Sequence, residues 1–403
     1  YTALGGLLGV PLAVPAIFVA GPLIGFGLVL LSAASLVAAG SIAIRQERHP
    51  GEVPMPETGL ALSAQVAVDE ALLATVSLAQ PMPLAGDHGR VRNEVREARQ
   101  LFDDRGWIEK PADYHRTPPV LSDPLLRPAR LRKLEYERLS FPSEYEPHPE
   151  EPGRDHWLSY LANRTAHAWV LRHESASRPW LVCIHGYQMG TPLWDLAAFR
   201  AGHLHHRLGL NLVLPVLPFH GPRKIGRVSG DGFLAADFLD TIHAEAQAMW
   251  DIRRLLSWIR GQGGSRIGAH GLSLGGYNTA LLSCLDGDLA CAIPGIPATD
   301  FSRLVWRHGP RLQIRYAEDQ GLLQDEVTET TRVISPLALE PKVPKERRYI
   351  FGGVADQLVP PDQVRDLWRH WDRPRIEWYQ GGHVSFRLHQ GVGRILDDAL
   401  REC

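Results

Sequence analysis

Cysteine is scarce in this chain, and the common metal-binding motifs are absent. The 403 residues include four cysteines, which are Cys183, Cys284, Cys291 and Cys403. So few cysteines in so long a chain exclude a small disulfide-stabilised scaffold. There is no CxxC pair and no HExxH sequence, so the usual zinc motifs are missing. We therefore expect no metal ion at the functional site.

An excess of charge of either sign is also missing. Lys and Arg number 43 against 45 Asp and Glu, which gives a net charge of -2. A general nucleic-acid binder needs a strong basic excess, so nucleic acid is not an expected partner. A hydrophobic content of 44% and a charged content of 22% exclude a disordered chain.

The first 44 residues lack Asp, Glu, Lys, Arg and His altogether. As one helix they would span about 66 Å, whereas the hydrocarbon core of a bilayer is roughly 30 Å thick. Gly21-Pro22 lies near the midpoint and is a natural break. We predict a transmembrane helical hairpin over residues 1–44, with helices at 3–20 and 23–44. A buried apolar hairpin is the alternative. A signal peptide is disfavoured, because the stretch is too long and has no basic n-region.

The residues around this hairpin suggest its orientation and its partners. Arg45 and Arg48 follow the second helix and favour the cytoplasmic side for the remainder of the chain. Membrane lipids are therefore expected partners. Small residues let helices approach closely, so a homo-oligomer through the hairpin is one expected assembly. The glycines that would allow it are Gly5, Gly6, Gly9, Gly25 and Gly27.

Residues 45–133 read as a linker and helical arm. A Pro-rich connector (49–58) precedes an apolar helix at 60–79, which is either a core helix or one lying on the bilayer. Its charges, Asp69 and Glu70, are too central for a third span. A second helix at 88–105 has an apolar stripe, and 107–130 is Pro-rich and expected to be irregular. A basic run follows, either as a solvated face or as a contact for anionic headgroups. It comprises Arg127, Arg130, Arg132, Lys133 and Arg138.

From residue 134 to 403, β-rich runs alternate with amphipathic helices, which predicts an α/β domain with a mostly parallel sheet flanked by helices. The expected strands are 134–141, 166–173, 180–185, 211–217, 266–270, 290–294, 347–352 and 375–379. The expected helices are 192–208, 239–261, 275–285, 361–371 and 388–402. Residues 301–345 lie between two strands and are expected to form a helical cap.

A G-x-S-x-G pentapeptide, Gly271 to Gly275, joins the expected strand RIGAH to a helix. This placement is typical of a nucleophile elbow. A sharp turn there would hold Ser273 in a strained conformation and expose its hydroxyl. Strand and helix would then pass so close that the outer two positions must lack side chains. A plain glycine-rich turn is the alternative interpretation.

A serine nucleophile needs a base that a third group holds in place. His383 directly follows the last expected strand and Asp356 directly follows the strand before it. The order Ser273, Asp356, His383 is that of α/β-hydrolase triads, and the carboxyl ends of parallel strands are where such sheets place their sites. Rival residues remain. They are Asp300 and Asp362 for the acid and His389 for the base.

A developing oxyanion needs two backbone donors. One is expected to be the N–H of Leu274. The other is expected from the loop after WLVCI, with Tyr187 as first candidate and Gln188 as second. Gly186, Gln188 and His220 are candidates for contact with the substrate.

Two other patterns do not indicate a functional site. His203, His205 and His206 fit a solvated helix end better than a metal site, because adjacent imidazoles cannot easily share one ion. Gly261-x-Gly263-Gly264 precedes a strand, so it is no dinucleotide fingerprint.

With these motifs, residues 134–403 resemble the α/β-hydrolase superfamily of serine hydrolases. From about residue 100 onward the chain is also similar to a group of actinobacterial α/β-hydrolase-fold proteins. The similar stretches are RGWIEKP (105–111), EPGRDHWLSYLANRTAHAWVLRH (151–173), RPWLVCIHGYQMG (178–190), NLVLPVLPFHGPR (211–223) and WDIRRLLSWIR (250–260). The resemblance implies an α/β-hydrolase fold and hydrolase chemistry. Residues 1–44 are outside the common pattern, and Tyr187 stands where many lipases and esterases have a third glycine.

These observations together predict a membrane-anchored serine hydrolase of carboxylic esters that acts through an acyl-enzyme. The acyl-transfer chemistry inferred from these motifs needs no cofactor. The expected location favours lipid-like acyl substrates, although a small-molecule ester fits the same residues. The same triad would also serve an acyltransferase, a thioesterase or an amidase. A catalytically silent membrane scaffold of hydrolase fold is the alternative of a different class.

Overall fold

The computed structural model describes residues 18–19, 21–79, 87–174, 178–234 and 237–402. The helices are α2 (Pro22–Gln46), α3 (Leu60–Ala79), α4 (Asp87–Asp104), α5 (Arg154–Ser159), α6 (Pro192–Ala198), α7 (Ala201–His206), α8 (Phe238–Gly261), α9 (Leu274–Leu285), α10 (Phe301–His308), α11 (Arg311–Asp319), α12 (Gln324–Thr330), α13 (Pro361–His370) and α14 (Gln390–Glu402). Short 3-10 helices are η1 (Pro111–Tyr114), η2 (Leu161–Arg164), η3 (Gly221–Arg223), η4 (Thr331–Ile334), η5 (Lys345–Arg347) and η6 (His383–Leu388). The strands are β1 (Leu125–Leu131), β2 (Leu134–Pro142), β3 (Thr165–Leu171), β4 (Trp180–Ile184), β5 (Asn211–Val216), β6 (Ile267–Leu272), β7 (Cys291–Gly295), β8 (Tyr349–Gly353) and β9 (Arg375–Tyr379).

The strands form a nine-stranded sheet in the order β1-β2-β3-β5-β4-β6-β7-β8-β9. Strands β1, β2, β3 and β5 pair antiparallel in turn, whereas β5, β4, β6 and β7 pair parallel. Every residue of β4, β5 and β6 is buried, as expected for strands covered on both faces. The α/β architecture predicted from the sequence is confirmed.

The chain divides into two compact units. The first unit contains residues 1–81, 351–366 and 376–396, and the second contains residues 82–350, 367–375 and 397–403.

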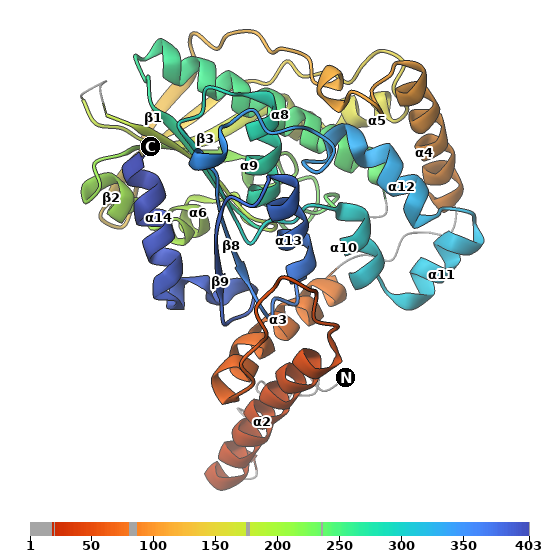
Figure 1. Cartoon of the computed structure of the whole chain (residues 1–403), viewed down its shortest axis with the longest axis vertical. Coiled ribbons are helices and arrows are strands. Elements are labelled where there is room, and N and C mark those ends of the chain that lie inside the picture. Colours follow the sequence, from red (N-terminus) through yellow and green to blue (C-terminus); the bar gives the residue numbers. More distant parts are fainter. Residues whose placement is uncertain (1–17, 20, 80–86, 175–177, 235–236, 403) are drawn as a thin grey trace. The chain divides into compact units, whose positions relative to one another are not determined.

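In the first unit, α2 and α3 pack along each other (Figure 1). A Cβ atom on Gly40 of α2 would lie 2.1 Å from the carbonyl oxygen of Ser63 and 2.8 Å from the amide nitrogen of Ala67. The two backbones are therefore in direct contact, which only glycine permits. The C-terminal end of α2 contributes Ala43 and Ile44, which pack against the core of this unit.

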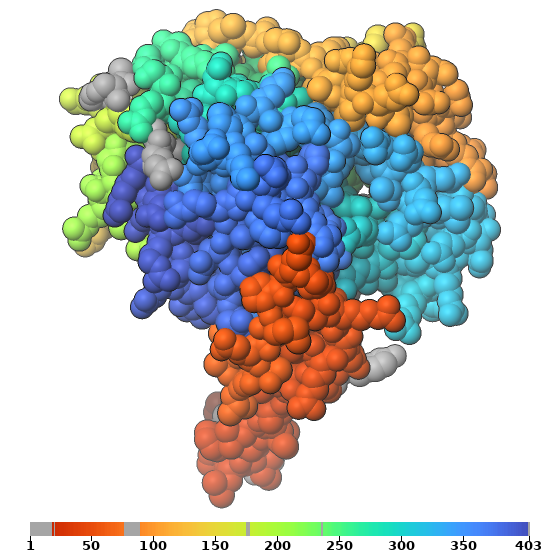
Figure 2. Space-filling view, viewed as in Figure 1, coloured from red at the N-terminus to blue at the C-terminus, as the bar shows by residue number. Residues whose placement is uncertain are grey.

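Helix α2 is, within the described part of the chain, the helix that is long and apolar enough to cross a bilayer. The mean hydropathy of its most apolar window is 2.2, and 22% of that window is buried. The surface of α2 is visible in red in Figure 2. Its large apolar side chains Leu23, Phe26 and Leu31 are 87%, 62% and 68% exposed. The predicted helix at 23–44 is thus present. The first helix of the predicted hairpin, at 3–20, lies outside the described residues apart from Phe18 and Val19.

In the second unit, α8 follows the apolar stripe that its sequence predicts. Its core residues are all buried, and they are Ile242, Ala246, Met249, Ile252, Leu256 and Ile259. Asp237 caps its first turn by accepting a hydrogen bond from the Asp240 N–H at 3.3 Å. The segment 301–345 contains α10, α11 and α12, so its predicted helical character is confirmed. Arg92 and Arg96 of α4 donate to carbonyl oxygens of this segment, at Gln320 and Gly321.

Two details of the predicted elements are wrong. Residues 125–130, expected to be irregular, belong to β1, which pairs with β2 across the turn at Arg132 and Lys133. Pro128 is compatible with this strand because β1 is at the edge of the sheet. The predicted helix at 192–208 is two helices, α6 and α7, because Arg200 between them adopts a left-handed conformation with φ 50°.

The basic residues of the run 127–138 are all exposed.

Candidate active site

The turn at Ser273, in the second unit, has the geometry of a candidate nucleophile site. Strand β6 ends at Leu272 and α9 begins at Leu274, so a single residue reverses the chain. Ser273 has φ 58° and ψ -113°, a conformation that L-residues rarely adopt. Its N–H donates to the carbonyl oxygen of Gly295 at 2.9 Å, which holds the turn to the end of β7. Between residues 267 and 284, Ser273 is the one residue that is not fully buried.

The two glycines of the pentapeptide are required by contact between backbones. A Cβ atom on Gly271 would lie 1.9 Å from the carbonyl oxygen of Gly275. A Cβ atom on Gly275 would lie 1.8 Å from the carbonyl oxygen of Ile184, the last residue of β4. Neither position can accept a side chain unless the backbone moves. This is the steric reason for glycine that the spacing of the motif predicts.

The loop after β4 lies against this turn. A Cβ atom on Gly186 would lie 3.6 Å from Cβ of Ser273 and 3.3 Å from the carbonyl oxygen of Leu272. The loop turns at Tyr187 and Gln188, where Gln188 has φ 62° and is exposed. Leu274 is the first residue of α9, and the first N–H groups of a helix have no acceptor within the helix. The two predicted sources of oxyanion donors therefore belong to segments that adjoin Ser273.

Buried polar residues fix the shape of this loop. The Nε2 atom of His185 accepts a hydrogen bond from the Leu217 N–H at 3.1 Å, so its proton is on Nδ1, which donates to the carbonyl oxygen of Gly186 at 2.8 Å. Burial lowers the pKa of His185, which keeps the ring neutral. Asp195 accepts from the Gly190 N–H at 2.9 Å. Its other oxygen accepts from the indole N–H of Trp169 at 2.8 Å. Nothing in the local sequence singles out Asp195 for this role.

His220 lines the wall next to the loop and is fully buried. Its Nδ1 donates to the carbonyl oxygen of Pro218 at 2.7 Å, and its ring lies 5.9 Å from that of Tyr187 and 5.0 Å from that of His185. Burial lowers the pKa of His220 well below its usual range. The side chain is therefore neutral, and it packs against the Tyr187 ring in the interior. A direct contact with substrate remains a prediction.

In the first unit, Asp356 and His383 form a hydrogen-bonded pair. Nδ1 of His383 donates to Oδ2 of Asp356 at 2.7 Å, and the acid side chain is completely buried. The other oxygen, Oδ1, accepts from the backbone N–H groups of Leu358 at 2.9 Å and Val359 at 2.8 Å. Since Nδ1 carries the proton, the neutral ring has its lone pair on Nε2. This is the tautomer that a general base requires.

The electrostatics of this pair favour the imidazolium. Burial lowers the pKa of His383, but the negative charge of Asp356 and its hydrogen bond raise it, and Asp69 raises it further. The net result is a pKa above the ordinary value of 6.5. His383 is thus able to take up a proton that a nucleophile loses.

The rival residues have other partners. Asp300 caps α10 by accepting from the Arg303 N–H at 3.0 Å, and it also accepts from the Ser302 hydroxyl at 2.7 Å. Asp362 lies in the first turn of α13. Nε2 of His389 lies 3.1 Å from the side-chain oxygen of Gln65, and burial lowers its pKa. Among these residues, Asp356 and His383 are the acid and base that the structure brings together.

A second acid, Asp69, accompanies the pair, and no sequence motif indicates it. Asp69 on α3 is fully buried, and its Oδ2 accepts from the His383 N–H at 2.7 Å. The available signal was the position of this acid within an otherwise apolar helix, since buried acids are rare unless they have partners.

The histidines at 203–206 lie in α7. Nδ1 of His205 donates to the carbonyl oxygen of Leu210 at 2.8 Å, and its ring stacks on His173 at 3.9 Å. His205 therefore has a structural role.

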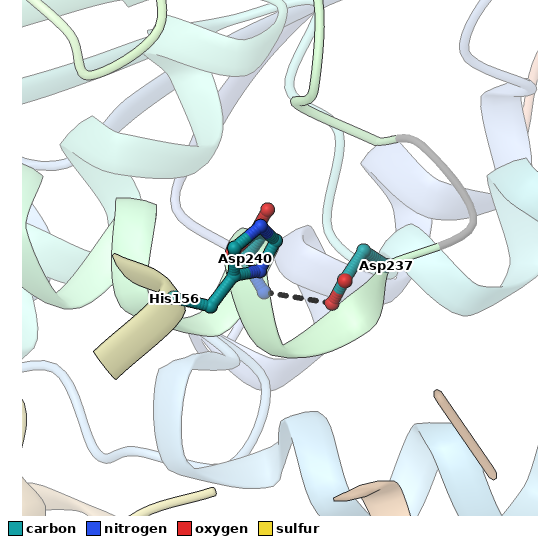
Figure 3. A group of neighbouring side chains, drawn as sticks. All are labelled: His156, Asp237 and Asp240. Carbon is teal, nitrogen blue, oxygen red and sulfur yellow. Dashed lines mark hydrogen bonds and ion pairs between the residues drawn. The ribbon is translucent and has the colours of Figure 1, made fainter. Parts of the chain in front are cut away.

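A different group of potential metal ligands contains His156, Asp237 and Asp240 (Figure 3). Arg90 already pairs with Asp237 at 2.7 Å, and the Tyr160 hydroxyl donates to Asp240 at 2.7 Å. Protein donors thus engage both carboxylates.

No family model matches the chain. Two proteins of Mycobacterium tuberculosis do match. They are uncharacterized protein MT2702 of strain CDC 1551 / Oshkosh and uncharacterized protein Rv2627c of strain ATCC 25618 / H37Rv. Each is 43% identical over 357 residues, which covers 88% of this chain and 86% of the relative. The chain belongs to the family of these two mycobacterial proteins.

Solved structures relate this family to a wider fold. Acetyl xylan esterase 1 from Thermoanaerobacterium sp. JW/SL YS485 superposes with a TM-score of 0.53 at 16% sequence identity, over 74% of this chain and 93% of the esterase. With the strand order given above, this likeness identifies the α/β-hydrolase fold that the motifs predict. At this identity it shows the fold alone, and activity has to be argued from the site.

Proposed function

We propose that the protein is a membrane-anchored serine hydrolase that cleaves carboxylic esters. The observation that carries the proposal is the backbone of Ser273. A non-glycine residue is held at φ 58° between a strand and a helix, with backbone contacts at Gly271 and Gly275 that exclude any side chain. Such strain is retained where it presents a nucleophile. The neutral tautomer of His383, held by Asp356, supplies a matching base.

The proposed mechanism has two acyl-transfer steps. His383 Nε2 takes the proton of the Ser273 hydroxyl as its oxygen attacks the ester carbonyl carbon. The N–H groups of Leu274 and Tyr187 stabilise the tetrahedral oxyanion. The imidazolium, stabilised by Asp356, returns the proton to the alcohol that leaves. Water then attacks the acyl-enzyme by the same route and releases the acid.

The packing of α2 within the first unit supports the proposed membrane anchor. A cleaved signal helix would not form part of the mature core, whereas Ala43 and Ile44 of α2 pack against the core residues Val53, Leu62 and Val66. The exposed side chains of α2 are large and apolar, and a bilayer would cover them. An ester that partitions into the membrane is the substrate class that this location favours.

The test is labelling with a fluorophosphonate probe in carbonate-washed membranes of cells that make the full chain. We expect the protein to stay in the washed membranes and to be labelled. Ser273→Ala should abolish labelling, and Ser159→Ala, which removes an exposed hydroxyl, should leave it unchanged. Equal labelling of a folded Ser273→Ala variant would contradict the nucleophile. Release of the protein by carbonate would contradict the anchor.

A further inference from the structure

Helix α3 rests on the segment that carries the acid of the pair. Leu62 and Val66 form a buried cluster with Val354 and Ala355, the two residues that precede Asp356. Asp69 lies one turn further along α3, on the same face, because positions spaced by three or four share one side of a helix. The apolar contacts of α3 therefore lead directly to a buried carboxyl group beside the acid and base.

One oxygen of Asp69 holds both segments of the pair. Oδ2 accepts a hydrogen bond from the His383 N–H at 2.7 Å and another from the Gln357 N–H at 3.2 Å. Gln357 directly follows Asp356 in the chain. A single carboxylate thus joins the backbone of the base to the residue after the acid, although Asp69 is 314 positions from His383.

Gly382 gives a second, independent sign of this arrangement. A Cβ atom at this position would lie 2.5 Å from Oδ2 of Asp69 and 3.1 Å from Oδ1. The backbone of Gly382, with φ -93° and ψ -173°, is one that any residue can adopt. Glycine is therefore needed here for the approach of the Asp69 carboxylate, and the turn itself does not demand it.

The environment of Asp69 disfavours its ionised form. Burial, and then the charge of Asp356, raise the pKa of Asp69 to about 7, while His383 and the two backbone donors oppose this rise. Oδ1 of Asp69 has no hydrogen-bond donor among the residues that the structure describes. The titratable groups that face Asp69 are Asp356, His383 and Tyr379. An apolar residue would fill this site at lower cost, so packing alone does not account for a carboxyl group.

We propose that Asp69 is a positioning residue for the His383–Asp356 pair, and that α3 is consequently part of the catalytic apparatus as well as a support for the anchor helix α2. Asp69 fixes the backbone from which the His383 side chain reaches Asp356, and its charge adds to that of Asp356 in stabilising the imidazolium. This inference rests on the proposed hydrolase function. It adds a residue from the N-terminal helices to the site.

The experiment compares the full chain in detergent with three variants, Asp69→Ala, Asp69→Asn and the neighbouring control Glu70→Gln. Turnover of p-nitrophenyl esters and the rate of fluorophosphonate labelling are measured between pH 5 and 9. We expect Asp69→Ala to lower kcat by about 100-fold with little change in KM, the cost of a misplaced catalytic group. Asp69→Asn keeps an acceptor for both N–H groups, so it should recover most of kcat. Both changes should move the acidic midpoint of kcat to lower pH. Glu70→Gln should change neither quantity.

A double-mutant cycle between Asp69 and Gly382 distinguishes the proposed positioning role from a general loss of fold. Gly382→Ala should lower kcat in the wild-type chain, because its methyl group displaces the Asp69 carboxylate. In the Asp69→Ala background the displaced atoms are gone, so the same change should cost little more. Additive effects of the two changes would overturn the proposal. A folded Asp69→Ala variant with wild-type kcat and pH midpoint would overturn it as well.

A measurement without turnover separates this proposal from the proposed function. The proton on His383 Nδ1 is expected as a downfield NMR resonance, assigned by its loss in His383→Gln. Its titration midpoint should fall in Asp69→Asn and stay constant in Glu70→Gln. If the wild type is not labelled at all, the hydrolase function fails while this midpoint still reports on Asp69. If the wild type is labelled and the midpoint does not move, the positioning role alone fails.

Discussion

Replacement of Asp356 by asparagine is the sharpest test of the acid and base, because the structure determines how the amide must lie. Oδ1 of Asp356 accepts two backbone N–H groups, from Leu358 and Val359. Only the carbonyl oxygen of an asparagine can accept them, so the amide nitrogen must occupy the place of Oδ2, next to Nδ1 of His383. Two donors cannot face each other. The imidazole proton therefore moves from Nδ1 to Nε2, so Nε2 loses the lone pair with which the proposed base would accept a proton.

The expected magnitude follows from this change of tautomer. Loss of the correct tautomer in a serine triad lowers kcat by about 10⁴-fold. That factor corresponds to roughly 5.4 kcal/mol of transition-state stabilisation, at about 1.36 kcal/mol for each factor of ten. The pH profile should change as well. His383 has a raised pKa because the charge and hydrogen bond of Asp356 outweigh burial. Without the charge, burial dominates, so the midpoint should fall from above 6.5 to below it.

The assay is the second-order rate constant of fluorophosphonate labelling between pH 5 and 9, for the wild type, Asp356→Asn and the exposed control Asp123→Asn. Thermal unfolding of each protein shows whether the fold is retained. The control should label at the wild-type rate. A folded Asp356→Asn variant that labels within tenfold of the wild type, or keeps its pH midpoint, would refute the assignment of Asp356 as the acid.

Two further predictions concern packing and stability. Gly275→Ala places a methyl carbon 1.8 Å from the Ile184 carbonyl oxygen, so we expect urea unfolding to show a destabilisation of at least about 3 kcal/mol. The control is Gly393→Ala, where nothing outside the local helix backbone lies within 4 Å of the added Cβ atom, and it should be neutral or stabilising by up to about 1 kcal/mol. Equal effects of the two changes would contradict the geometry of the turn at Ser273. The pKa of Asp69 rises on folding from 3.8 to about 7, so its contribution to stability is present below pH 3.8 and is lost as the pH rises towards 7. Asp69→Asn lacks this loss and should gain stability relative to the wild type as the pH rises from 4 to 7, by up to about 4 kcal/mol at ~1.36 kcal/mol per pKa unit. A difference in unfolding free energy that stays constant across this range would refute the raised pKa of Asp69 in the folded protein.

The fold was largely predictable because its elements have strong local patterns. The apolar strands β4 and β5 and the stripe of α8 occur at the expected positions, within one or two residues at each end. The errors arose where local pattern and tertiary context differ. Strand β1 contains Pro128 and exposed arginines, and it forms because β2 pairs with it. The break between α6 and α7 depends on one left-handed residue, Arg200, which has no sequence signature of its own.

The candidate site divides in the same way. Ser273 and its glycines form a short motif with fixed spacing, in which steric contact of Gly271 with Gly275 and of Gly275 with Ile184 dictates residue type, so the sequence suffices to recognise it. Asp356 and His383 follow strands β8 and β9, and their pairing was expected from that order. The residues that support the site through buried hydrogen bonds could not be predicted from the sequence. Asp195 acts on Gly190 and Trp169 through buried hydrogen bonds, and such contacts depend on side-chain packing that no periodicity encodes.

The amino-acid sequence by itself indicated the turn at Ser273, the positions of Asp356 and His383 after two strands, the α/β sheet and one apolar helix, because motif spacing and periodicity along the chain mark each of them. Only the tertiary structure decided that Asp69 meets His383 and Gln357, at separations of 314 and 288 residues. The physical reason is that a buried carboxylate finds its donors wherever packing brings backbone N–H groups to it. Packing of α3 on the segments after β8 and β9 is a property of the folded chain.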